Sequence, residues 1–129
     1  MPISTSSNGD YNAISFNEKL SLVHEHWSPR VIAEMNDYQF KVVKVLGDFI
    51  WHAHKDTDET FIVLDGVLRI DLEDGHVLVH AGEMFVVARG MQHKPFAESQ
   101  VSLLLIEPRG VVNTGDEPSD RAASNDVWV

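Results

Sequence analysis

The chain has 129 residues, of which 43% are hydrophobic, and its 20 acidic residues against 10 basic ones give a formal net charge of −10. This length and composition suit one domain with a real core, and the negative charge argues against nucleic acid or an anionic membrane as a partner. The absence of cysteine excludes disulfides and a cysteine nucleophile, and because the first residues lack the features of a secretory signal, we expect a cytoplasmic protein.

The N-terminal segment is polar at first and then amphipathic. Residues 1–12 are rich in Ser, Asn and Gly, which predicts a flexible tail. Ser15 and Glu18 are spaced as a capping box, in which each side chain bonds the other's backbone amide. Apolar residues recur at helical spacing at Phe16, Leu20 and Val23. We predict a short helix over residues 15–24 whose apolar stripe covers one face of a barrel.

From Arg30 onward the pattern is that of short β-strands separated by turns. Apolar and polar residues alternate over residues 38–42, which is typical of a half-buried strand. Asp65-Gly66 and Asp74-Gly75 stand between strand-like runs and indicate tight hairpins. About eight or nine strands favour a sandwich or barrel. We therefore assign residues 13–108 to a single all-β domain and expect residues 109–129 to form an irregular acidic tail.

Four residues with metal-binding side chains lie within this β region. His52 and His54 are separated by one residue, so on a strand their side chains point to the same face, about 7 Å apart along the chain. Glu59 opens the next apolar run and His93 lies between later strands, so neighbouring strands can bring both toward the pair. Three imidazoles and one carboxylate suit a divalent ion such as iron, manganese, cobalt, nickel or zinc. On a six-coordinate ion they leave two positions open for water or substrate.

Asp56 is a competing carboxylate for this site. If the strand continues past His54, Asp56 shares the face of the two histidines, so that both Asp56 and Glu59 stay open as ligands. No glycine-rich phosphate loop and no Gly-x-Ser-x-Gly segment is present. The remaining histidines have no comparable pattern and are interpreted as solvated or structurally bonded: His24, His26, His76 and His80.

The spacing of the predicted ligands resembles the first motif of the cupin superfamily, a group of small metal-binding jelly-roll barrels. That motif runs glycine, five residues, His-x-His, three or four residues, glutamate, six residues, glycine. Here His52, His54, Glu59 and Gly66 keep the spacing, whereas Gly47 lies four residues before His52. The resemblance favours Glu59 as the carboxylate ligand.

The second cupin motif is also recognisable, with two departures. Gly82, Gly90 and His93 stand at its glycine and histidine positions, but Ala88 and Ala97 replace the usual proline and asparagine. Neither replaced residue is a ligand in the family pattern. The later run Ile106-Glu107-Pro108 is similar to small single-domain cupins labelled mannose-6-phosphate-isomerase-like, although the sequence has no basic cluster that would hold a phosphate.

The resemblance implies a double-stranded β-helix, the cupin jelly-roll barrel, with one short N-terminal helix. It also implies one divalent metal, with Fe(II) or Mn(II) expected and Zn(II) or Ni(II) compatible, and a small-molecule ligand in the barrel. Three functions stay open. The protein is a metalloenzyme of dioxygenase, lyase or isomerase type, a binding or sensing module with the same pocket, or a barrel that the metal only stabilises. The sequence assigns no catalytic residue.

Strand alternation predicts which apolar residues line the pocket and which face solvent. The inward-facing residues Phe40, Val42, Phe61, Val63 and Phe85 are candidates for an apolar wall around the metal. Such a wall is equally the core of any barrel, and we expect most of these residues to be core. An outward-facing apolar set is expected from Trp51, Ile62 and Leu64. Exposed apolar patches of this kind mark interfaces, so we predict a homodimer, which the resemblance to small cupins also implies.

Overall fold

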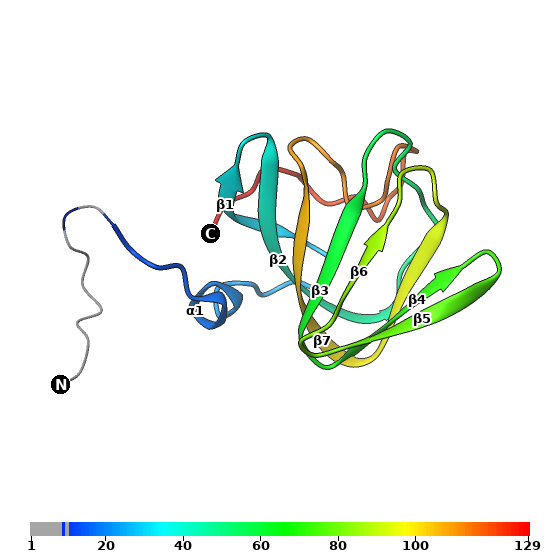
Figure 1. Ribbon diagram of the computed structural model, residues 1–129, viewed down its shortest axis with the longest axis horizontal. Helices are drawn as coiled ribbons and strands as arrows, with labels where there is room; N and C mark the ends of the chain where they lie inside the picture. The colour runs from blue at the N-terminus through cyan, green and yellow to red at the C-terminus, as the bar shows by residue number, and fades with distance from the viewer. Residues whose placement is uncertain (1–8, 10) are drawn as a thin grey trace.

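The computed structural model describes residue 9 and residues 11–129, so most of the expected N-terminal tail, residues 1–12, lies outside the described residues. Figure 1 shows strands that curve into an open barrel, with one short helix beside it. The all-β class with one helix is therefore confirmed. No described helix is long and apolar enough to cross a membrane. The elements are α1 (Phe16–Leu20), β1 (Arg30–Met35), β2 (Tyr38–Asp48), β3 (Glu59–Asp65), β4 (Val67–Leu72), β5 (Gly75–His80), β6 (Met84–Val87) and β7 (His93–Pro108).

The long strand β7 is the centre of the sheet. The strands pair in the order β1-β2-β7-β3-β6, and β4 pairs with both β5 and β7, always antiparallel. The first part of β7, residues 93–96, pairs with β4, and its later part, residues 102–106, pairs with β3. The described sheet has seven strands, fewer than the eight or nine expected, because β7 runs as one continuous strand and residues 49–58 form no strand.

Gly66 forms a corner and not the hairpin that Asp65-Gly66 predicted. Strands β3 and β4 do not pair with each other but follow one another along β7. Gly66 has a φ of +91°, and a Cβ there would lie 3.0 Å from Cγ2 of Val101. Glycine therefore suits this corner both by its backbone angle and by its lack of a side chain.

Strand β2 is buried on both faces, and its inward face is the opposite of the one we expected. Val43 and Val45 point into the barrel core, and Lys41, on the same face, is also buried. Phe40 and Val42 instead lie on the outer face, where they pack with the α1 segment. The prediction that these two residues wall the metal pocket is therefore wrong. The alternation was recognised, but it does not say which face is inside when both are covered.

Helix α1 caps the outer face as predicted, although it is shorter than residues 15–24. Ser15 is the N-cap, and its Oγ accepts a hydrogen bond from the Glu18 amide at 3.2 Å. The helix ends at Leu20, which packs with Val23 in a cluster buried against Val42. Ile62 and Leu64 pack at the edge of this cluster and are half-buried. Trp51 is the member of the expected outward set that is exposed, at 49%.

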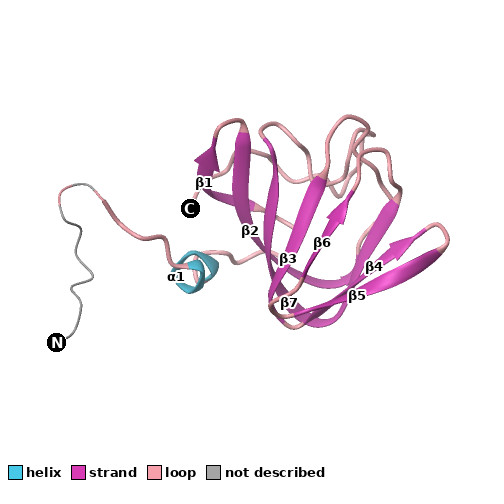
Figure 2. Ribbon diagram, in the orientation of Figure 1, coloured by secondary structure: helices cyan, strands magenta, loops and turns pink. Residues whose placement is uncertain are grey.

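The C-terminal segment, residues 109–129, contains no helix or strand and lies against the barrel. The Val31 amide donates to the Val127 carbonyl at 2.8 Å, and the Val129 amide donates to the Val31 carbonyl at 3.2 Å. Figures 1 and 2 show this segment running as a loop from β7 back across one end of the barrel, so that the C terminus lies beside β1. The backbone bonds and the packing of the Val129 side chain hold the segment in place, while the Trp128 side chain is exposed.

Candidate metal centre

The four predicted ligands come together at one end of the barrel. Glu59 opens β3 and His93 opens β7. His52 and His54 lie on a loop where we expected a strand. Backbone bonds tie this loop to β7: the Phe49 amide donates to the Pro95 carbonyl at 3.1 Å, and the amides of His52 and His93 each donate to the other's carbonyl, at 3.0 and 2.9 Å. The four side chains are nevertheless buried together, and one donor atom from each lies within 4.8 Å of all the others.

The donor atoms face one another around Glu59. Nε2 of His54 and Nε2 of His93 each lie 3.4 Å from Oε1 of Glu59, longer than a normal hydrogen bond. Nδ1 of His52 lies 2.9 Å from the Ile50 carbonyl, and Nδ1 of His93 lies 3.0 Å from the Met91 carbonyl. In these pairs Nδ1–H donates to the carbonyl, which leaves Nε2 of each ring as the lone-pair nitrogen.

The centre fits a divalent ion because its donor atoms lack other partners. Nε2 of His54, Nε2 of His93 and Oε1 of Glu59 are buried without a hydrogen-bond partner. Each such atom costs about 1–3 kcal/mol when it is left unsatisfied. One ion among them satisfies all three, and imidazole nitrogen with carboxylate oxygen is a donor set that Fe(II), Mn(II), Zn(II) and Ni(II) accept.

The electrostatics of the cluster favour the protonation states that a metal requires. Burial, together with the neighbouring His93, lowers the pKa of His52 from 6.5 to about 4. Burial alone would raise the pKa of Glu59, but the adjacent rings of His54 and His93 outweigh it and hold this pKa well below its usual range. At neutral pH His52 is therefore neutral and Glu59 is ionised, as metal ligands must be.

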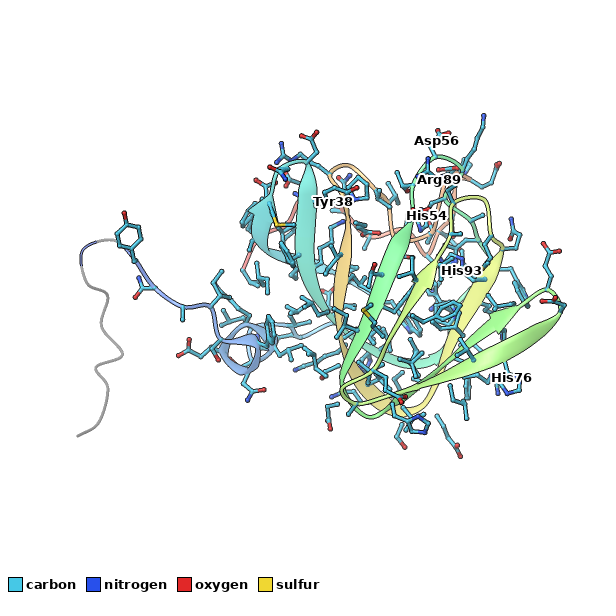
Figure 3. All side chains as sticks on the ribbon, in the orientation of Figure 1. Tyr38, His54, Asp56, His76, Arg89 and His93 are labelled. Atoms are coloured by element: carbon cyan, nitrogen blue, oxygen red, sulfur yellow. The ribbon has the colours of Figure 1, made fainter. Side chains whose placement is uncertain are left out.

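Asp56 does not join the cluster. It is exposed, and Figure 3 shows it at the outer tip of the loop, whereas His54 and His93 lie below it within the barrel. The structure thus brings Glu59, and not the competing Asp56, to the histidines. His76 lies on β5, far from the cluster, in line with its interpretation as a histidine outside the site.

A buried ion pair beside the centre was missed by the sequence analysis. Nζ of Lys41 lies 2.8 Å from Oε1 of Glu107, and both side chains are almost fully buried. Burial raises the pKa of Glu107 well above its usual range, and the charge of Glu59 adds to this effect, whereas Lys41 opposes it. The run at 38–42 alternates as a half-buried strand does, which indicates an exposed polar side, whereas the structure buries Gln39 and Lys41 on that side.

A cavity leads from the surface to the centre. Its lining includes His52, Glu59 and Glu107. Its lining also includes Trp27 and Phe49, whose rings stack at a centroid distance of 4.6 Å. The apolar wall consists of Val43, Val45, Phe61, Leu103 and Leu105. Phe61 is in the wall as predicted, while Val63 and Phe85 belong to the core cluster around it.

Comparison with known proteins agrees with this architecture. The family described as "Cupin domain" matches residues 41–107. A cupin-2 domain containing protein from Shewanella frigidimarina NCIMB 400 is 57% identical, with a TM-score of 0.73 over 74% of this chain and 94% of that one. Protein NMB1881 from Neisseria meningitidis is 35% identical, with a TM-score of 0.69 over 75% of this chain and 99% of that one.

A curated protein also matches the chain. The uncharacterized protein YdbB of Bacillus subtilis (strain 168) is 32% identical over 84 residues, which are 64% of this chain and 72% of YdbB. The family match covers half of the chain, and it includes all four residues of the cluster at the barrel end. The chain belongs to the cupin family.

Proposed function

We propose that this chain is a metal-dependent cupin enzyme that acts on a small oxygen-bearing molecule. The observation that carries the proposal is the set of four buried donor side chains, three of them with unpartnered donor atoms, at the inner end of an open cavity. His52 and Glu59 line that cavity, so a molecule inside it reaches the centre directly. A purely structural site would be closed.

His52, His54, Glu59 and His93 would hold the ion, for which Fe(II) or Mn(II) is our first choice. When bound, the ion supplies Lewis acidity or a position for dioxygen. The chain itself orients the ligands through the carbonyl bonds to Nδ1 of two rings. The apolar wall keeps water from the centre. The reaction we propose is of dioxygenase, lyase or isomerase type. The cytoplasmic location of the protein stays a prediction.

The cavity favours a compact and largely apolar ligand over a phosphosugar. None of the described residues that line it is a lysine or an arginine, and Glu59 and Glu107 add two carboxylates. The nearby Lys41 is already paired with Glu107. A phosphate would therefore meet negative charge without a free cation. The likeness to the mannose-6-phosphate-isomerase-like group thus does not extend to a phosphorylated ligand in our proposal.

A second copy of the chain is the partner we propose. Trp51 is exposed at 49%, and on the edge strand β6 Met84 is exposed at 64% and Val86 at 46%. Strand β6 pairs with β3 alone among the described strands. An open strand edge with apolar side chains is suited to pairing with another chain.

A reaction screen tests the enzymatic proposal. Small hydroxy and keto compounds are incubated with metal-loaded and metal-free protein, under air and under nitrogen, and products are identified by mass spectrometry. We expect a product that depends on the metal and returns with only one or two particular ions, with His76→Ala as active as the wild type. Stabilisation by a compound without any product, for every ion tried, would instead support the binding or sensing module.

A further inference from the structure

The loop at residues 49–58 carries two ligands of the proposed centre without the support of a strand. One bridge joins His52 to His93, and no ladder continues to His54. The ring of His54 also lacks a support that the other two rings have. Nδ1 of His52 and Nδ1 of His93 each donate to a carbonyl, whereas no described residue bonds Nδ1 of His54. The position of His54 therefore depends on how its backbone is held.

Asp116 holds that backbone on both sides of His54. The Asp116 amide donates to the carbonyl of Ala53 at 3.3 Å, and its Oδ2 accepts a hydrogen bond from the amide of Lys55 at 2.7 Å. The carbonyl of His54 itself accepts from the amide of Gly90 at 2.8 Å. The residue before His54, His54 itself and the residue after it are therefore each bonded through their backbone to a neighbouring segment.

The segment that carries Asp116 is itself built to lie against this loop. Gly115 has a φ of +85°, and a Cβ there would collide with the carbonyl oxygen of Ala53, so close approach requires glycine. Nδ2 of Asn113 donates to the Trp27 carbonyl at 2.9 Å, and Thr114 is 2% exposed. Asp116 is thus presented to the loop by a fixed segment of the chain.

We propose that Asp116 is a positioning residue of the metal centre. By fixing the peptide groups on either side of His54, it keeps Nε2 of His54 directed at Glu59 and His93 and so raises the affinity for the ion. The physical reason is preorganisation: a ligand held in place beforehand loses less freedom when the metal binds. The inference rests on the proposed metal site, and Asp116 acts through the backbone because it is not among the donor residues.

Binding of Co(II) tests this role without any assay of activity. The affinity for Co(II) is measured by competition with a chromophoric chelator, and the visible spectrum of the bound ion reports its coordination. For Asp116→Ala we expect an affinity lower by about tenfold or more, the usual effect of losing a group that orients a ligand, and an altered spectrum. Asp116→Asn retains an acceptor oxygen and should stay within about threefold of the wild type. Asp120→Ala is the control, since it removes the same charge from an exposed position of the same segment.

Several results would overturn the inference. One is an Asp116→Ala variant that binds Co(II) like the wild type, or loses only thermal stability in the metal-free state, as a merely structural residue would. Another is an equal loss of affinity in Asp120→Ala, which would indicate long-range charge and not the clamp. If Asp116→Ala does not fold, amide hydrogen exchange of the wild type decides, because Lys55 must be protected and fast exchange there contradicts the clamp.

The outcome for the wild type separates this inference from the proposed function. A wild type that takes up no Co(II) overturns both. A wild type that binds Co(II) while Asp116→Ala binds it equally well overturns only the role of Asp116. Gly115→Ala provides an independent check, because its Cβ pushes the segment away from Ala53, and we expect it to weaken Co(II) binding at least as much as Asp116→Ala.

Discussion

Replacing Lys41 with methionine leaves the Glu107 carboxylate buried without its cation. An exposed ion pair contributes about 0–1 kcal/mol, but removing one partner of a buried pair costs about 3–5 kcal/mol. The side chains of Lys41 and Glu107 are only 3% and 2% exposed, so the second range applies. Because the pKa of Glu107 is already raised by burial and by the charge of Glu59, proton uptake limits the loss. We expect Lys41→Met to lower the free energy of unfolding by about 3 kcal/mol, a large share of the roughly 5–15 kcal/mol by which a domain is stable.

The assay is urea denaturation of the metal-free protein at neutral pH, arranged as a double-mutant cycle. In a Glu107→Gln background the Lys41→Met change should cost only about 1 kcal/mol, because no charge is left unpaired. Lys55→Met, at an exposed position, is the matched control and should stay within about 0.5 kcal/mol. A Lys41→Met variant as stable as this control, or a cost that is equal in both backgrounds, would refute the reasoning.

Three further predictions concern pH, charge and assembly. The pKa of His52 is lowered from 6.5 to about 4, so between these pH values the unfolded state binds a proton that the folded state does not. On acidification through this range, the free energy of unfolding of the metal-free wild type should therefore fall by about 3 kcal/mol more than that of His52→Gln. An equal fall in both proteins, measured by calorimetry, contradicts the shift. Glu59→Gln should weaken metal retention by about tenfold or more while circular dichroism stays unchanged, and unfolding would contradict this. The particle mass from light scattering should be twice the 14.5 kDa of one chain, and it should fall toward 14.5 kDa in the double variant Trp51→Lys/Met84→Lys. A wild-type mass of 14.5 kDa would exclude the dimer.

The candidate metal cluster was accessible from sequence because its four members fit the two-part spacing of the cupin motifs. One intervening residue puts His52 and His54 near each other even though their segment is a loop, and the starts of β3 and β7 supply Glu59 and His93. The choice between Asp56 and Glu59 was not accessible from alternation. It depends on where the chain turns after His54, and there Asp58 fixes the loop by accepting a hydrogen bond from the Arg89 amide.

The wider surroundings of the site depend on long-range packing that no local pattern contains. Polar and apolar sides of β2 are both buried, because α1 covers Phe40 from outside while Glu107 meets Lys41 from inside. A period of two residues identifies the strand but not its inward face. The contact of Asp116 with the histidine loop joins positions 61 residues apart at Lys55, and nothing near either residue in the sequence indicates it.

The most direct test of the central claim is the metal content of the histidine variants. The wild type and single His→Ala variants are incubated with Mn(II) or Fe(II), desalted and analysed for metal per chain. The site geometry predicts about one ion per chain in the wild type and in His76→Ala, and almost none in His52→Ala, His54→Ala and His93→Ala. Equal occupancy in His54→Ala and His76→Ala would contradict the assignment of the centre.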